Sequence, residues 1–386
     1  MEGKALIRIL KERNYNNIIN LEHGETVLTD YNVLEAYFKK TCPEYIFLLA
    51  GKSGGIKANQ KMPATLMLDN LQIISNVLSA AHKFEVEKLL YLASCCVYPK
   101  HAEQPMHPDM LMAGPLEPTN SAYATAKLAG IELCRAYRKE YGDNFIFAVP
   151  ANIFGPGDNF SGENSHVIAA LIRKMHEAKE RGNNAIEIWG TGKPRREFIY
   201  VADLADACLF LMDHYNNEEP VNIGSGAAMS ISDLAMVIRD VVGYRGQLRY
   251  DSSKPDGMPE KVLDSTFLNS LGWKPSVSFE IAAEKTHQQS PRQAVERSCD
   301  KGPSPIEIDR QPAMTDLPHC DTERPRHHQD AHRRGQFLAR EPVRDDLCEE
   351  DVRNDKANAN KTSHIYETFR ITFLHLKTFP FKNGHY

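Results

Sequence analysis

The sequence of 386 residues contains no apolar run of the ~18 residues that a membrane span requires. It has no excess of positive charge, because 51 Asp and Glu outnumber 46 Lys and Arg, and nucleic-acid binding requires a basic surface. The eight cysteines lie at irregular spacings, unlike a disulfide framework, and the N-terminus lacks the apolar core of a signal peptide. We therefore expect a cytoplasmic protein with reduced thiols, without a membrane or nucleic acid as partner and without a bound metal.

Short apolar runs alternate with longer amphipathic stretches over roughly the first 275 residues. The runs at 45–50, 88–93 and 145–150 predict strands, and the stretches at 66–82 and 123–141 predict helices. Strands that alternate with helices of this length pair in parallel, and continuous apolar strands indicate a sheet covered on both faces. The sequence thus predicts an α/β fold with a doubly wound parallel sheet of the Rossmann type.

The spacing of these elements changes near residue 152. A Gly-Pro-Gly-Asp-Asn turn at 155–159 is followed by a predicted helix at 165–181 and a short strand at 186–189. We therefore expect a dinucleotide-binding domain over residues 1–152 and a smaller substrate-binding lobe over 153–285.

The periodic pattern fails around Thr286. Beyond it the chain is rich in Arg, Asp, Pro and His and has little amphipathic period. Such a segment buries too little apolar surface to offset its ordering entropy. We expect residues 286–386 to form a disordered or aberrant tail.

The segment Tyr-Ala-Thr-Ala-Lys places Tyr123 and Lys127 four residues apart, on one face of the predicted helix. A nearby ammonium group favours the phenolate, so we expect the pKa of Tyr123 to fall from its usual ~10 toward neutral pH. Such a tyrosine can exchange a proton with an oxygen while a hydride moves at the same carbon. On spacing alone most such pairs are surface residues, but Ser94 follows a predicted strand at the edge where ligands bind.

Two further candidates are a cysteine pair and a histidine. One of Cys95 and Cys96 should face the ligand crevice, where a thiolate can remove a proton beside a ketone, although a small buried hydrophobe is the commoner role. His166 opens a predicted helix, where it is either structural or the matching acid. A helix N-terminus disfavours an imidazolium, so a charged His166 would need a compensating anion.

Six motifs stand in an order and spacing that resembles the GDP-L-fucose synthase family. They are SCCVYPK from Ser94, LEPTNSAYATAK from Leu116, PANIFGPGDNF from Pro150, NSHVIAALIRK from Asn164, GKPRREFIYVADLADA from Gly192 and SKPDGMPEKVLD from Ser253. LLAGKSGGIKAN from Leu48 resembles the family's loop after its third strand. The resemblance covers the chain to about residue 285, and related keto-sugar reductases of the same subgroup stay open.

This resemblance implies epimerisation and NADPH-dependent reduction of GDP-4-keto-6-deoxy-D-mannose to GDP-L-fucose by a homodimer. Ser94, Tyr123 and Lys127 match the reductase triad, Cys96 matches the base of epimerisation, and His166 matches its acid. The positions that match cofactor contacts are Gly3, Ala50, Gly51, Asn70, Tyr123, Lys127, Pro150, Asn152, Ile153 and His166. Those that match contacts to the nucleotide-sugar are Arg173, Trp189, Arg196 and Lys254.

The chain departs from the family pattern in three ways. It begins at what matches the last glycine of the GxxGxxG turn, Gly3, so the first strand and two glycines are absent. Glu22 follows the second strand, where an acid binds an NAD ribose, so NAD(H) stays open beside NADP(H). The third departure is the unrelated tail. From the missing start we expect weak cofactor binding and unpaired ladder groups on the neighbouring strands, and an inactive relic stays open.

Overall fold

A computed structural model describes residues 1–21, 28–160, 165–254, 256–299, 367–368 and 371–374. All of these residues belong to one compact unit. None of the helices within these ranges is long and apolar enough to cross a membrane.

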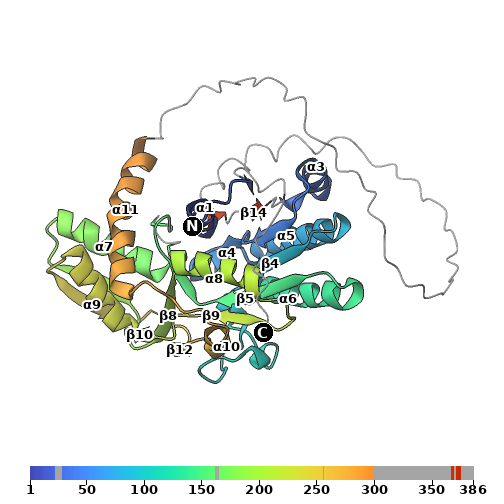
Figure 1. Ribbon diagram of the computed structural model, residues 1–386. Helices are drawn as coiled ribbons and strands as arrows, with labels where there is room; N and C mark the ends of the chain where they lie inside the picture. Colours follow the sequence, from blue (N-terminus) through green and yellow to red (C-terminus); the bar gives the residue numbers. More distant parts are fainter. Residues whose placement is uncertain (22–27, 161–164, 255, 300–366, 369–370, 375–386) are drawn as a thin grey trace, which may run out of the picture. The chain divides into compact units, whose positions relative to one another are not determined.

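The main sheet has six strands in the order β1-β14-β2-β4-β5-β9, and four of them, β2, β4, β5 and β9, pair in parallel. Helices α1 and α8 pack together on one face, and α5 and α6 pack together on the other (Figure 1). The predicted doubly wound parallel sheet is therefore confirmed. The strands are β1 (Ile18–Asn20), β14 (Ile371–Leu374), β2 (Tyr45–Leu48), β4 (Lys88–Leu92), β5 (Phe145–Pro150) and β9 (Val221–Ile223), and the helices are α1 (Glu2–Glu12), α3 (Tyr31–Thr41), α5 (Pro63–Lys83), α6 (Ser121–Tyr141) and α8 (Val201–His214).

Burial explains why polar and apolar residues do not alternate along the central strands. Every residue of β2, β4 and β5 is buried, because helices cover both faces of the sheet. The two 21-residue helices α5 and α6 each end where the chain changes direction, and α6 stops at Gly142, whose φ of 78° suits a glycine. The core of the molecule thus lies on this sheet, and its carboxyl edge is held rigidly.

Strand β14 comes from the tail and lies between β1 and β2, antiparallel to both. Its four residues pair with all of β2, from Ile371 opposite Leu48 to Leu374 opposite Tyr45. The expectation of unpaired ladder groups on the neighbouring strands is therefore wrong for the described strands. The short run Ile-Thr-Phe-Leu has high β propensity, which the average composition of the tail concealed.

Helix α11 (Phe279–Cys299) runs past Thr286, where the sequence predicted that order would fail. Ala282, Thr286 and Ser290 are buried on one face of it, and α11 packs against α7 and α9. These small, partly polar residues at a spacing of four give no apolar signal, so sequence reasoning missed the helix. Apart from α11, β14 and residues 367–368, the rest of the predicted tail lies outside the described ranges.

The second lobe contains two small sheets with four helices beside them. Strands β7 (Ala185–Trp189) and β11 (Gln247–Asp251) pair in parallel, while β6 (Asn152–Phe154), β10 (Ala228–Ser230) and β12 (Glu260–Lys261) pair with β8 (Arg195–Tyr200). The chain returns to the main sheet through α8 and β9 before it completes this lobe, so residues 153–285 do not form one uninterrupted unit. The remaining elements are α4 (Ile56–Lys61), α7 (Val167–Glu180), α9 (Ile231–Val242), α10 (Thr266–Ser270), the 3-10 helices η1 (Cys95–Val97) and η2 (Pro108–Met110), and the pair β3 (Lys52–Ser53) and β13 (Glu367–Thr368).

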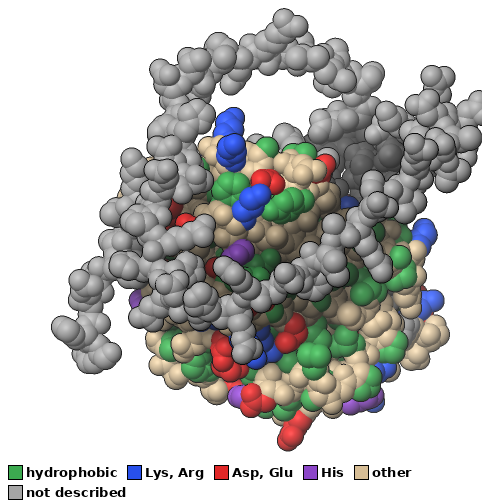
Figure 2. All heavy atoms as spheres, turned by 90° about the vertical axis from the view of Figure 1, so that its right-hand side faces the viewer, with side chains coloured by type: hydrophobic (Ala, Val, Ile, Leu, Met, Phe, Trp, Pro, Cys, Tyr) green, Lys and Arg blue, Asp and Glu red, His purple; other side chains and the backbone are tan. Residues whose placement is uncertain are grey.

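The surface mixes side-chain types. On the face in Figure 2, hydrophobic side chains are scattered among acidic and basic ones. Exposed large hydrophobic residues include Leu68, Met112 and Tyr141, which are far apart in the sequence. Single exposed hydrophobic side chains of this kind are ordinary on a protein surface.

Candidate functional site

The candidate site lies where β4 ends and α6 begins. Ser94 follows β4 and caps η1, and its Oγ accepts a hydrogen bond from the Cys96 amide at 3.4 Å. Tyr123 lies in the first turn of α6 and shares a side-chain hydrogen bond with Ser94. The structure therefore brings Ser94, Cys96 and Tyr123 together at the carboxyl edge of the sheet, as the sequence predicted.

Lys127 is buried one turn further along α6. Its Nζ donates to the Leu92 carbonyl at 3.0 Å and lies 5.1 Å from the centre of the Tyr91 ring. Burial lowers the pKa of Lys127 to about 8. The predicted fall in the pKa of Tyr123 is wrong, since burial and then the neighbouring Cys96 raise it above its usual value. Tyr123 is therefore a phenol at neutral pH, and Lys127 ties β4 to α6.

The loop after β2 packs against Lys127. Asn70 of α5 is fully buried, and its amide accepts from the Lys52 N–H at 3.1 Å and donates to the carbonyls of Lys52 at 2.8 Å and Leu66 at 2.6 Å. A Cβ on Gly51 would lie 2.7 Å from Asn70 Oδ1 and 3.1 Å from Lys127 Nζ. Gly51 and the adjacent Ala50 therefore form, with Asn70 and Lys127, a closely packed cradle beside the site, in which only a residue without a side chain fits at position 51.

The other predicted cofactor contacts lie at the end of β5. Pro150 is the last residue of β5, and Asn152 and Ile153 belong to β6. Asn152 donates through Nδ2 to the Glu197 carbonyl at 2.8 Å, and its Oδ1 lies 4.0 Å from Cys95 Sγ. Asn152 thus links the end of β5 to the cysteine pair.

Cys96 has two polar neighbours that sequence reasoning missed. Asn120 Nδ2 lies 3.2 Å from Cys96 Sγ, and Lys261 Nζ lies 3.4 Å from it. The hydrogen bond from Cys95, followed by the charge of Lys261, holds the pKa of Cys96 well below its usual value. The same hydrogen bond and burial raise the pKa of Cys95. Of the two adjacent thiols, Cys96 is therefore the one that ionises.

His166 precedes α7 and lies beside a buried acid. Its Nδ1 is 3.8 Å from Oδ1 of Asp158, which is fully buried. The structure therefore places an acidic side chain beside the histidine at the start of α7, where a charged imidazole would need a compensating anion.

The start of α1 joins the two halves of this region. Gly3 is buried in the first turn of α1 beside Glu2, whose carboxylate is 3.6 Å from the Met1 amino group. Burial raises the pKa of Glu2, and Asp158 and His166 lie within its electrostatic reach. Glu2 also lies within electrostatic reach of Tyr123 and Lys127.

The predicted substrate residues divide into two groups. Trp189 lies near two ammonium groups, since Lys174 Nζ and Lys254 Nζ are each 5.8 Å from its ring centre. Arg196 of β8 is half-buried and donates to the Asp256 carbonyl at 3.4 Å. Arg173, by contrast, forms an ion pair with Glu177 one turn along α7. Lys174 is an α7 cation at the tryptophan that sequence reasoning missed, and the role of Arg173 in substrate binding stays a prediction.

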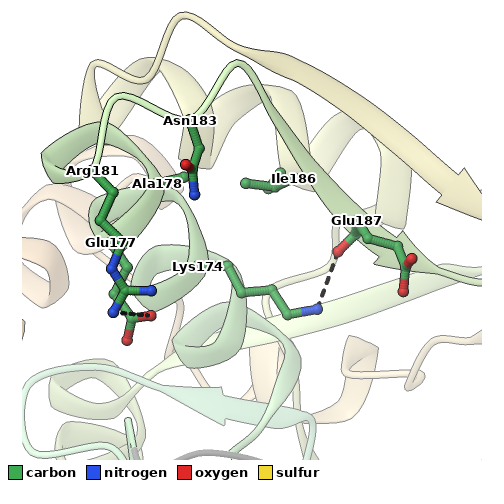
Figure 3. A pocket seen from close by; sticks show the side chains of 7 residues that line it. All are labelled: Lys174, Glu177, Ala178, Arg181, Asn183, Ile186 and Glu187. Atoms are coloured by element: carbon green, nitrogen blue, oxygen red, sulfur yellow. Dashed lines mark hydrogen bonds and ion pairs between the residues drawn. The ribbon is translucent and has the colours of Figure 1, made fainter.

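A pocket lies between α7 and β7 (Figure 3). Lys174 points into it and donates to the Glu187 carbonyl at 3.1 Å, while Arg181 pairs with Glu177 on the opposite side.

Glu22 lies outside the described residues, so its place relative to the cofactor contacts stays a prediction. Among the residues that the structure describes, no group of three or more His, Cys, Asp or Glu is arranged to hold a metal ion.

Comparisons with known proteins agree on the family. Residues 1–224 match the NAD dependent epimerase/dehydratase family. The chain is 48% identical to the probable GDP-L-fucose synthase 1 of Oryza sativa subsp. japonica over 287 residues, 74% of this chain and 88% of that protein.

Two solved structures share the fold. The GDP-L-fucose synthetase of Naegleria fowleri bound to NADP matches with a TM-score of 0.68 at 30% identity, over 76% of this chain and 91% of that one. The GDP-6-OMe-4-keto-L-xylo-heptose reductase of C. jejuni matches with a TM-score of 0.72 at 31% identity, over 76% and 95%. The chain belongs to the GDP-L-fucose synthase family, within the NAD dependent epimerase/dehydratase family.

Proposed function

We propose that this protein converts GDP-4-keto-6-deoxy-D-mannose to GDP-L-fucose, by epimerisation beside the ketone followed by NADPH-dependent reduction. The observation that carries the proposal is the cluster of Ser94, Cys96 and Tyr123 at the end of β4, where an ionised thiol and a protonated phenol lie together. The names of the rice and Naegleria fowleri relatives support the same substrate class.

Cys96 is the base of the epimerisation in this proposal. A 4-keto group acidifies the C–H bonds on either side of it, so a thiolate can remove one of these protons. His166, with Asp158 beside its Nδ1, returns a proton to the opposite face of the carbon. Each inversion exchanges one carbon-bound hydrogen with solvent.

Tyr123 is the acid of the reduction. Its burial keeps the phenol protonated, so it can donate its proton to the ketone oxygen, while Ser94 binds the same oxygen. NADPH, when bound, supplies the hydride to the ketone carbon. Lys127 holds α6 against β4 and thereby fixes the distance between Tyr123 and Ser94.

The residues around Gly51 fit a bound dinucleotide. The cradle beside Lys127 has no room for a Cβ at position 51, and Asn70 fixes the backbone that lines it. We propose that Ala50, Gly51 and Lys127 hold the nicotinamide end, with Asn152 beside them. NADP(H) is the proposed cofactor and NAD(H) the alternative, which titration of NADPH against NADH decides.

Trp189 and its flanking lysines are the proposed nucleotide subsite. An aromatic face suits a nucleobase, and two ammonium groups suit a diphosphate. A second candidate is reduction of a different GDP-linked keto-sugar, which the structural similarity to the C. jejuni reductase favours. An inactive relic is the third, because the buried Glu2 carboxylate disfavours an anion at the start of α1.

A substrate panel separates these candidates. NADPH oxidation is followed at 340 nm with GDP-, dTDP- and UDP-linked 4-keto-sugars at equal concentration. The proposal expects the highest kcat/KM with GDP-4-keto-6-deoxy-D-mannose. A higher value with another sugar supports the second candidate, and no oxidation with any of them despite cofactor binding supports the third. The proposal also includes a cytoplasmic homodimer, for which sedimentation equilibrium tests the dimer.

A further inference from the structure

Lys261 contacts the cysteine pair from a distant part of the sequence. It is the last residue of β12, which pairs with β8 so that Lys261 lies opposite Arg196. Its Nζ lies 3.4 Å from Cys96 Sγ, a contact between residues 165 positions apart. Among the residues that the structure describes, no carboxylate lies within ion-pairing distance of Lys261. Its ammonium group therefore has the thiol as its charge partner.

The backbone that follows Lys261 is held by two hydrogen bonds. The Val262 N–H donates to Gln104 Oε1 at 2.8 Å, and the Leu263 N–H donates to Glu197 Oε2 at 2.8 Å. Glu260, before it, pairs with Arg195 of β8, so the backbone around Lys261 is fixed and its side chain leaves the strand in a defined direction. The contact with Cys96 is thus built by the fold and does not depend on a flexible surface side chain.

The titratable groups that face the two thiols come from three elements. Tyr123 of α6 interacts with both thiols, Arg196 of β8 interacts with Cys95, and Lys261 of β12 interacts with both. Burial alone would lower the pKa of Lys261, but the cysteines raise it above its usual value. An ammonium group that stays charged at neutral pH therefore lies against the proposed base.

We propose that Lys261 is a positioning residue that holds Cys96 in its ionised form and aims it at the carbon beside the ketone. The inference rests on the proposed function for its role in catalysis. The ionisation itself is a property of the protein without substrate. Removal of the ammonium should raise the pKa of Cys96 and slow epimerisation, while reduction through Tyr123 continues.

Alkylation of Cys96 tests this without any turnover. Iodoacetamide reacts with the thiolate, and the tryptic peptide Leu89–Lys100 contains only Cys95 and Cys96, which fragmentation in a mass spectrometer distinguishes. An adjacent opposite charge lowers a pKa by ~1–3 units, so Lys261→Met should alkylate at Cys96 about tenfold or more slowly at pH 7. Its rate–pH curve should shift to higher pH.

Two variants control the measurement, and a third can replace Lys261→Met. Lys261→Arg should restore most of the rate, and Lys193→Met, which removes an exposed lysine of the same lobe, should leave the curve unchanged. If Lys261→Met does not fold by circular dichroism, Lys261→Gln takes its place.

Superimposable rate–pH curves for the parent and Lys261→Met would overturn the inference, even if Lys261→Met raised KM as a phosphate ligand would. A shifted curve in a protein without catalytic activity would support the role of Lys261 and count against the proposed function alone. The two failures are thus distinguishable.

Discussion

Gly51→Ala tests the packing of the cradle with a single methyl group. The new Cβ would lie 2.7 Å from Asn70 Oδ1, well inside normal contact distance, and 3.1 Å from Lys127 Nζ. Asn70 cannot move away freely, because its amide makes three hydrogen bonds to the backbone of Lys52 and Leu66. Either these bonds or the position of Lys127 must therefore change.

The expected cost follows from opposing contributions. Overpacking a buried site costs ~1–3 kcal/mol, and each lost hydrogen bond costs ~1 kcal/mol. Replacing glycine by alanine also stabilises the folded protein by ~0.4–1 kcal/mol, because it lowers the conformational entropy of the unfolded chain. The net loss is about 1–3 kcal/mol, or roughly 2–4 °C in Tm for each kcal/mol in a protein of this size. A displaced Lys127 should also lower kcat, since a ~1 Å misplacement can cost ~10²-fold.

Thermal unfolding by circular dichroism and steady-state NADPH oxidation measure the two effects. Gly114→Ala is the matched control, because its nearest contact would be Pro99 at an ordinary 3.4 Å. A Gly51→Ala protein with the Tm and kcat of Gly114→Ala would refute the packing argument for the cradle.

Four other changes have defined outcomes. Tyr123→Phe should lower reduction by ~10²–10⁴-fold with little change in substrate binding, and turnover within threefold of the parent would exclude its role as acid. Cys96→Ser should lose solvent-deuterium exchange beside the ketone, whereas loss in Cys95→Ser alone would show that the other thiol is the base. Glu2→Gln should raise Tm at pH 7, because a carboxyl whose folded pKa is raised loses stability as pH rises above its usual 4.5, and the gain should vanish below that pH. Deletion of residues 367–386 should lower the urea midpoint, since β1 and β2 lose β14, and an unchanged midpoint would show that β14 adds no stability.

The local sequence pattern was sufficient to predict the main sheet and part of the candidate site. The strands at 45–48, 88–92 and 145–150 are continuous apolar runs, which burial on both faces requires. Ser94 and Tyr123 could be paired because a strand end and the next helix start meet at one edge of a parallel sheet.

The remaining features depend on long-range contacts or on burial. Lys261 meets Cys96 across 165 residues, and no local spacing predicts that contact. The pKa of Tyr123 has the opposite shift to the predicted one, because spacing identified the cation but not the burial of the phenol. Strand β14 was missed because composition was averaged over the tail, although the four residues themselves favour a strand.

The most direct test of the proposed function is the isotope content of the product. The protein is incubated with GDP-4-keto-6-deoxy-D-mannose and NADPH in D₂O, and the nucleotide-sugar is analysed by NMR. We predict GDP-L-fucose with deuterium on both carbons that flank the former ketone, since each inversion takes its hydrogen from solvent. A reduced sugar without deuterium at these carbons, or with the parent configuration there, would contradict the proposal that this protein is an epimerase as well as a reductase.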